Sequence, residues 1–182
     1  MKIPYMFKIV NSGDAGVGKT AFLKRYTTGE FIEESIETIG TGFFTKTLYL
    51  GLEHEKIDLT IWDLGGQDRF RHIVKGFVMG AAGALLFFDL TRYETFKHLD
   101  EWVHILRYGE GDEVLDENLP ILLLGNKSDL KDLIEIKQSE IDDYVKMQNL
   151  VGYFQTSAKT GENVNESVEM LVKYIYETDK GI

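Results

Sequence analysis

A glycine-rich segment near the start of the chain carries the residue types that bind a polyphosphate. It runs from Gly13 to Thr20 and matches the phosphate-loop pattern of two spaced glycines followed by a lysine and a serine or threonine. Glycines let several backbone N–H groups point at one anion, because a Cβ at the crowded positions would block close approach. A helix that begins at Lys19 would add its positive N-terminal end. We therefore expect Lys19 to contact the β- and γ-phosphates of a nucleotide and the Thr20 hydroxyl to bind Mg²⁺.

A second polar segment follows an apolar stretch that ends at Asp63. At the end of a strand, the Asp63 carboxylate could reach Mg²⁺ through a water molecule. Gly66 could offer a backbone N–H to the terminal phosphate. Gln67 carries both an acceptor and a donor, so it could orient an attacking water. Taken alone, the same residues also fit a strand-ending aspartate followed by a glycine turn.

Two further segments could recognise a base. Asp129, in the sequence Asn126-Lys127-Ser128-Asp129, can accept hydrogen bonds from the N1–H and N2–H₂ groups of guanine, which adenine does not offer in that geometry. An unpaired buried carboxylate is costly, so this side chain would reject ATP. The stem of Lys127 could lie along the base, and a backbone N–H within residues 156–159 could meet guanine O6. Each segment alone could also be an ordinary turn.

The loop from Phe31 to Thr41 offers two more candidates. Thr38 could be a second Mg²⁺ ligand, and Phe31 could cover the base. Alternatively, Thr38 could simply be an exposed threonine and Phe31 a partly buried phenylalanine, neither with a role in binding.

The elements that would position these residues alternate along the chain. We expect strands at 5–10, 43–50, 56–64, 84–89, 121–124 and 151–155, with 43–64 forming a hairpin. Helices are expected at 19–28, along 96–106 and at 139–148, and a short helix should follow the loop at 65–76. A last helix should begin after Asn163, whose side chain should cap it, with Glu166 as the return partner. Such alternation predicts an α/β fold, a mostly parallel sheet with helices on both faces and ligands at the carboxyl ends of its strands.

Composition narrows the function classes. The chain has 182 residues and 43% hydrophobic residues, which predicts one globular domain. A net charge of −10 disfavours nucleic acid and anionic lipid as partners. There is no cysteine, hence no acceptor for a prenyl or palmitoyl anchor, and the apolar run 77–88 is too short to span a membrane. We expect a cytoplasmic monomer that would reach membranes only through its partners.

The order of these segments resembles the Ras superfamily of small GTPases over essentially the whole chain. Residues 67–71, Gln-Asp-Arg-Phe-Arg, resemble the Rab run that follows the catalytic glutamine. Thr38-Ile39-Gly40 followed by Phe43 resembles the Rab first switch, whereas residues 62–67 are equally similar to the Arf branch.

The resemblance implies a three-layer P-loop fold over residues 1–182, with a six-stranded sheet, one antiparallel edge strand and five flanking helices. It implies a switch that converts GTP to GDP and phosphate, with two nucleotide-sensing loops at about 31–42 and 65–76. The implied catalytic residues are Gln67, Lys19 and Thr38, and the implied Mg²⁺ ligands are Thr20, Thr38 and, through water, Asp63. The implied nucleotide-binding residues are Gly13, Asp14, Ala15, Gly16, Val17, Gly18, Lys19, Thr20, Ala21, Phe31, Thr38, Gly66, Asn126, Lys127, Asp129, Ser157, Ala158 and Lys159.

The implied partners are a guanine nucleotide and effector, exchange-factor and GAP proteins. Residues 29–41 contain no arginine, so intrinsic hydrolysis should be slow and acceleration should come from a partner. Ala15 stands where Ras has a glycine near the transition state, and its methyl group could crowd an incoming catalytic residue. The last residues carry no cysteine tail, which would fit an archaeal relative, and the acidic segment 109–118 has no assigned role.

Two other function classes are weighed against the switch. One is a guanine-nucleotide-binding interaction module with little or no hydrolysis, which the presence of Lys19, Thr38, Asp63 and Gln67 disfavours. The other is a P-loop ATPase or small-molecule kinase, which Asp129 disfavours.

Overall fold

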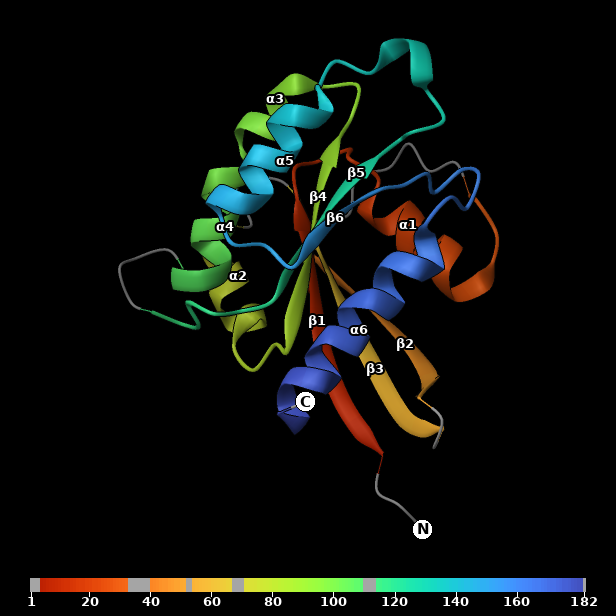
Figure 1. The fold of residues 1–182 in the computed structure, drawn as a ribbon, viewed down its shortest axis with the longest axis vertical. Helices are drawn as coiled ribbons and strands as arrows, with labels where there is room; N and C mark the ends of the chain where they lie inside the picture. Colours follow the sequence, from red (N-terminus) through yellow and green to blue (C-terminus); the bar gives the residue numbers. More distant parts are fainter. Residues whose placement is uncertain (1–3, 33–39, 52–53, 67–70, 110–113, 182) are drawn as a thin grey trace.

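The fold is described from a computed structural model, which covers residues 4–32, 40–51, 54–66, 71–109 and 114–181. Among these residues, six strands form one sheet in the order β2-β3-β1-β4-β5-β6 (Figure 1). Only β2 and β3 pair antiparallel, and the other neighbours pair parallel. The strands are β1 (Tyr5–Gly13), β2 (Thr41–Leu50), β3 (Glu55–Leu64), β4 (Gly83–Asp89), β5 (Ile121–Asn126) and β6 (Gly152–Gln155). The predicted sheet, with one antiparallel edge strand, is confirmed.

Helices cover both faces of the sheet, as predicted. One face carries α1 and α6, and the other carries α2, α3, α4 and α5 (Figure 1). The helices are α1 (Lys19–Thr28), α2 (Arg71–Val78), α3 (Tyr93–Lys97), α4 (Leu99–Tyr108), α5 (Gln138–Met147) and α6 (Val164–Lys180), with a short 3₁₀ turn at Lys131–Leu133. Since only His98 separates α3 from α4, these two form one interrupted stretch, and the described chain has the five helical segments expected.

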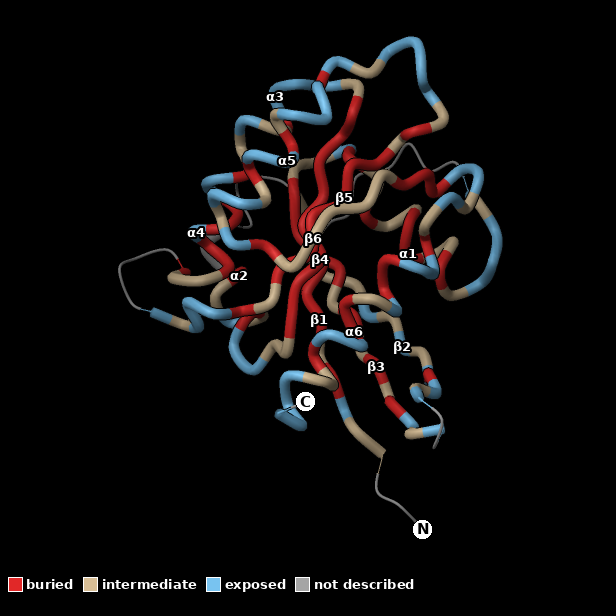
Figure 2. Tube along the Cα trace, in the orientation of Figure 1, coloured by how far each residue is buried: buried red, intermediate tan, exposed pale blue. Residues whose placement is uncertain are grey.

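A hydrophobic core lies on each face because neighbouring strand residues point to opposite sides. Ile9 and Leu59 pack toward α1 and α6, whereas Val10 and Leu86 pack toward α2, α4 and α5. The central strand β4 is buried along its whole length, as expected for a strand covered on both faces (Figure 2). If a strand shifted by one residue against its neighbour, its side chains would face the opposite core. The alternation of apolar residues therefore fixes the register of the strands.

Two local details differ from the expectation. The apolar stripe along 96–106 packs into one core, as predicted, but its helix is interrupted at His98, which ends α3 and precedes α4. Asn163 precedes α6 but makes no capping hydrogen bond with its side chain. Its backbone is left-handed, with φ 53°, and its Nδ2 donates to the Gln155 carbonyl at 2.7 Å instead. Asn163 therefore joins the end of β6 to the start of α6.

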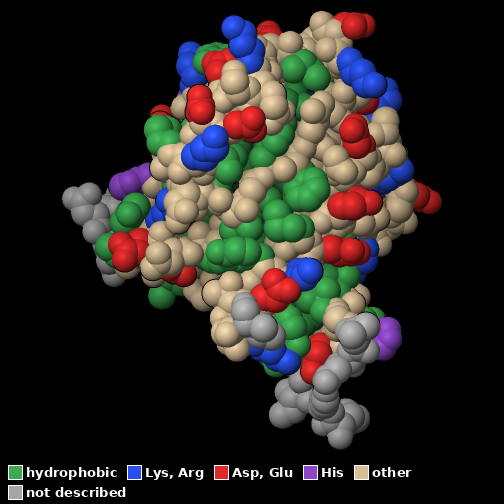
Figure 3. Space-filling model, in the orientation of Figure 1, with side chains coloured by type: hydrophobic (Ala, Val, Ile, Leu, Met, Phe, Trp, Pro, Cys, Tyr) green, Lys and Arg blue, Asp and Glu red, His purple; other side chains and the backbone are tan. Residues whose placement is uncertain are grey.

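The carboxyl ends of the parallel strands lie at the same end of the sheet. The polar segments described in the sequence analysis directly follow these strand ends. Gly13 at the end of β1 pairs with Phe87 in β4, and Asp89 at the end of β4 pairs with Asn126 at the end of β5. None of the described helices is long and apolar enough to cross a membrane. On the face shown in Figure 3, hydrophobic side chains gather in the middle, where β6 runs between α5 and α6.

Candidate functional site

The phosphate loop, residues 13–20, joins β1 to α1, as predicted. Two of its glycines have backbone conformations and surroundings that exclude a side chain. Gly13 has φ 131°, and a Cβ there would lie 2.3 Å from the Phe87 carbonyl oxygen. Gly18 has φ 96°, and a Cβ there would lie 2.3 Å from Nδ2 of Asn126. The glycines therefore allow the loop to pack closely against β4 and β5.

Lys19 begins α1 and is buried, with 6% of its surface exposed. Its Nζ donates to the carbonyl oxygens of Gly13 at 2.6 Å and Asp14 at 2.7 Å. Burial lowers the pKa of Lys19 to about 8, although the charges of Asp63 and Asp14 oppose this shift. A buried ammonium group held by carbonyl oxygens suits an anionic ligand, which would favour its charged form.

Thr20 and Asp63 meet beside Lys19. The Thr20 hydroxyl donates to Oδ2 of Asp63 at 2.5 Å, and Nδ2 of Asn11 donates to Oδ1 of Asp63 at 3.0 Å. Asp63 is 1% exposed, and burial raises its pKa despite these hydrogen bonds. The sequence did not single out Asn11, which lies inside the apolar strand β1 and is fully buried.

This oxygen pair fits Mg²⁺ only if the nucleotide completes the site. A hydroxyl and a carboxylate are the hard oxygen ligands that Mg²⁺ prefers, usually together with waters and substrate phosphates. The described residues bring together no group of three or more His, Cys, Asp or Glu side chains that could hold a metal by themselves. Phosphate oxygens would therefore have to supply the remaining ligands.

Gly66, just after β3, lies directly on the phosphate loop. A Cβ at Gly66 would lie 2.4 Å from the carbonyl carbon of Asp14 and 2.5 Å from the nitrogen of Ala15. Only a glycine allows this backbone contact, which brings the start of the second predicted switch loop to the phosphate loop.

The other end of the site is built from the segments that follow β5 and β6. Asn126 joins it to the phosphate loop, because its Nδ2 donates to the Val17 carbonyl at 2.9 Å. Its Oδ1 accepts hydrogen bonds at 3.3 Å from the Ala158 amide and the Thr156 hydroxyl. The Ser157 hydroxyl donates to Oδ1 of Asp129 at 2.6 Å. The structure thus brings together the two segments expected to recognise a base.

Other predicted residues lie around this end. The Nζ of Lys127 lies 2.6 Å from Oδ2 of Asp89. Phe31 is half-buried and packs against the core under α1, as does Ala21, whereas Lys159 is exposed. Thr38 and Gln67 lie outside the described residues, so their roles stay predictions from the sequence.

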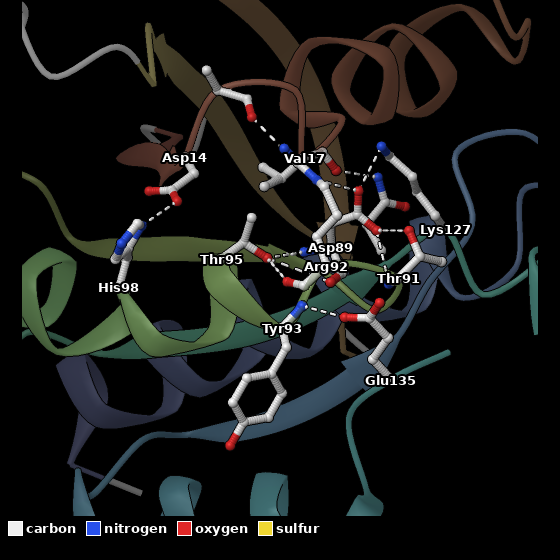
Figure 4. Close-up of polar contacts among 12 residues, drawn as sticks. Asp14, Val17, Asp89, Thr91, Arg92, Tyr93, Thr95, His98, Lys127 and Glu135 are labelled. Carbon is white, nitrogen blue, oxygen red and sulfur yellow. Dashed lines mark hydrogen bonds and ion pairs between the residues drawn. The ribbon is translucent and has the colours of Figure 1, made fainter. Parts of the chain in front are cut away.

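Side chains of Arg92, just before α3, of His98, between α3 and α4, and of Trp102 in α4 hold the phosphate loop from a second direction, which the sequence did not reveal. Asp14 accepts from Nε1 of Trp102 at 2.8 Å, and its Oδ2 lies 2.7 Å from Nδ1 of His98. The Nη2 of Arg92 donates to the Ala15 carbonyl at 3.0 Å (Figure 4). We call these contacts the outer side of the loop, and those of Lys19 and Thr20 the inner side.

The outer-side partners follow the phosphate loop by 77 to 88 residues, so no local motif connects them. One signal was present, since Asp89 ends a continuous apolar run and a buried carboxylate needs partners. His98 has its ring nitrogen paired with the Asp14 carboxylate. The hydrogen bond that the His98 ring donates to the Asp14 carboxylate raises the pKa of His98, although burial opposes the shift.

An aromatic group lies next to the two predicted switch loops. Phe43, Trp62 and Phe77 pack in a row, with ring centroids 4.4 Å apart for the first pair and 5.3 Å for the second. Phe43 is 59% exposed, and Nζ of Lys8 lies 4.3 Å from the Trp62 ring. Phe43 follows the first loop, while Trp62 and Phe77 flank the second, so this group adjoins both.

Comparison with known proteins gives a consistent result. Residues 8–177 match the family described as the Ras family. The chain is 38% identical to the Ras-related protein RABA4b of Arabidopsis thaliana over 177 residues, which are 97% of this chain and 75% of that protein. It is 40% identical to the Ras-related protein Rab11A of Nicotiana tabacum over 172 residues, 94% of this chain and 76% of that protein. It is 37% identical to the Ras-related protein Rab-11C of Dictyostelium discoideum over 172 residues, 94% of this chain and 73% of that protein.

Proposed function

Because the chain belongs to the Ras family and is a Rab-like small GTPase, a switch that binds and hydrolyses GTP, we propose that its site divides into a phosphate end and a base end. The phosphate end consists of residues 13–20 with Asp63 and Gly66. The base end consists of residues 126–129 and 157–159. The observation that carries this proposal is the hydrogen bond from Asn126 to the Val17 carbonyl at 2.9 Å, which joins the two ends.

At the phosphate end, the buried ammonium of Lys19 binds the β- and γ-phosphates, and the N–H of Gly66 donates to the γ-phosphate. Thr20 would hold Mg²⁺ directly and Asp63 would hold it through a water, and the ion would supply positive charge to the phosphate oxygens. The water oxygen bonds to the γ-phosphorus while the bond from this phosphorus to the β–γ bridging oxygen breaks. GDP leaves with the bridging oxygen, and the protons of the water stay with the released phosphate or pass to solvent. From the sequence, Gln67 orients this water and Thr38 binds Mg²⁺ in the GTP state.

At the base end, Asp129 selects guanine. Its Oδ1 is held by the Ser157 hydroxyl at 2.6 Å, which fixes the direction of the carboxylate. A carboxylate has about four lone-pair positions, so it can still accept from both N1–H and N2–H₂ of guanine.

The substitution Asp129→Asn tests this assignment. We expect the affinity for GTP to fall about 100-fold or more, because an amide nitrogen then faces guanine donors. The variant should prefer xanthosine triphosphate, whose 2-oxo group accepts from the new amide. Equilibrium binding of both nucleotides gives the result, and Asp132→Asn, an exposed aspartate in the 3₁₀ turn Lys131–Leu133, is the matched control. An unchanged preference for GTP in Asp129→Asn would contradict the assignment.

The partners of the switch are effector, exchange-factor and GAP proteins, and effectors bind at the aromatic group Phe43, Trp62 and Phe77. An exposed phenylalanine beside both switch loops supports this surface, because ordering of the loops by the γ-phosphate would change what surrounds it. Slow intrinsic hydrolysis, acceleration by a partner and the cytoplasmic location stay predictions from the sequence.

A further inference from the structure

Arg92 lies where β4 leads into α3, and its backbone is fixed on both sides. It is the residue that precedes α3, with extended backbone angles of φ −137° and ψ 95°. Its N–H donates to the Asp89 carbonyl at 3.0 Å, and its carbonyl accepts from the Thr95 hydroxyl at 2.8 Å. The next amide, of Tyr93, donates to Glu135 at 2.9 Å. The direction in which the Arg92 side chain leaves the backbone is therefore set by the fold (Figure 4).

The guanidinium of Arg92 bridges Asp89 and the phosphate loop. Its Nε lies 3.0 Å from Oδ2 of Asp89, and its Nη2 donates to the Ala15 carbonyl at 3.0 Å. A Cβ built on Gly16 would lie 3.6 Å from the same Nη2, so the side chain lies along residues 15 and 16. The two hydrogen bonds use the fork of donors that distinguishes arginine from lysine.

Asp89 extends this bridge to the base end. Its Oδ2 is also 2.6 Å from Nζ of Lys127, and its Oδ1 accepts from the amide and hydroxyl of Thr91 at 2.9 and 2.7 Å. Burial alone would raise the pKa of Asp89, but the hydrogen bonds from Lys127 and Thr91 outweigh it and hold the pKa below its ordinary value. A charged, buried carboxylate thus anchors both Lys127 and Arg92.

The hydrogen bond from Arg92 to the Ala15 carbonyl also fixes the direction of the Gly16 N–H, which belongs to the same peptide group. In a trans peptide the C=O and the following N–H point in opposite directions, and this chain has no cis peptide in its described part. Because Arg92 holds the Ala15 carbonyl outward, the Gly16 N–H points toward the inner side of the loop. The charge of Arg92 also acts there, since it lowers the pKa of Lys19 beyond the effect of burial.

We propose that Arg92 is a positioning residue for the nucleotide, which aims the Gly16 N–H at the β-phosphate by holding the Ala15 carbonyl outward. The inference rests on the proposed phosphate end. Arg92 does not touch the nucleotide, and it acts through the Ala15–Gly16 peptide. Replacing Arg92 should therefore weaken only nucleotides that carry a β-phosphate. A general loosening of the fold would instead weaken nucleotides with and without a β-phosphate alike.

The test compares Arg92→Gln, Arg92→Lys and the control Arg107→Gln. Arg107 lies at the end of α4 and also donates to a backbone carbonyl, that of Gln148, at 3.0 Å. The control therefore matches the lost charge and the lost type of hydrogen bond at another place in the fold. The measured quantities are the dissociation rate of a fluorescent GDP analogue and the affinities for GDP and GMP, obtained by competition.

We expect Arg92→Gln to release GDP about 10-fold faster than the wild type, as the loss of one charge-assisted hydrogen bond implies. Arg92→Lys should restore part of this loss, because it keeps the charge but cannot hold Asp89 and Ala15 together. The affinity for GMP, which has no β-phosphate, should stay within about 2-fold, as should every value for Arg107→Gln. The inference would be overturned if Arg92→Gln lost equal affinity for GDP and GMP, or if it released GDP no faster than Arg107→Gln. A wild-type protein that binds neither nucleotide would overturn the proposed phosphate end instead.

Discussion

The inner and outer sides of the phosphate loop are held by different kinds of contact. On the inner side, Lys19 and Thr20 contact groups within or next to the loop, namely its own carbonyls and the Asp63 carboxylate. On the outer side, Arg92, His98 and Trp102 reach the loop from the residue before α3, the break between α3 and α4, and α4 itself. In the site proposed above, the inner side supplies ligands for the nucleotide, and the outer side fixes the shape of the loop that carries them. Inner-side changes should therefore affect nucleotide binding most, and outer-side changes should affect stability more.

The largest expected effect is on the inner side. Replacing Lys19 with Met keeps an unbranched side chain but removes the buried charge. We expect the affinity for GTP to fall about 100-fold or more, since hydrogen bonds to charged groups contribute about 1.5–3 kcal/mol each. Equilibrium binding measures this, and a loss of less than about 10-fold would contradict the inner-side assignment of Lys19.

The next effect is on the outer side. Trp102→Phe removes the donor to Asp14 and shrinks a side chain that is 0% exposed. We expect the free energy of unfolding, measured with urea, to fall by about 2 kcal/mol, while the affinity for GTP falls less than about 10-fold. The proposed difference between the two sides would be contradicted if this variant kept its free energy of unfolding and lost as much affinity for GTP as Lys19→Met.

The smallest expected effect is the pH dependence of His98. Asp14 lies on one side of its ring, and Glu94 and Glu101 act on it from its own helical stretch. Because folding raises the pKa of His98 above 6.5, its contribution to stability is full below that pH and is lost as the pH rises through the higher, folded value.

The test is the melting temperature of His98→Gln at about pH 6 and about pH 8.5. Between these values, the wild type should lose about 1–3 °C more than the variant, as expected for a partly exposed pair. His104→Gln, on the exposed side of α4, should behave like the wild type. Identical pH dependence in all three proteins would show that the contact between His98 and Asp14 adds no stability.

The same contrast explains what could be predicted from the sequence. The fold followed from apolar strands that alternate with helices, and residues 13–20, Asp63 and residues 126–129 followed from local motifs at strand ends. Arg92, His98 and Trp102 could not be found this way, because their contacts with the loop depend on how the chain between β4 and the middle of α4 packs against it. Asn11 was missed because a polar residue inside an apolar strand gives no motif. The cap at Asn163 was predicted wrongly because the Gln155 carbonyl, a partner from another element, competes for its side chain.

That bond from Asn163 also bears on self-association. β6 is the outer strand of the sheet, and such an edge can pair with a strand of another molecule. The Thr156 N–H donates to Gly125 in β5, so the Gln155 carbonyl of the same peptide faces the open edge. Asn163 occupies that acceptor, and β6 has only 4 residues. A single amide thus removes one of the few backbone groups through which this edge could begin to aggregate.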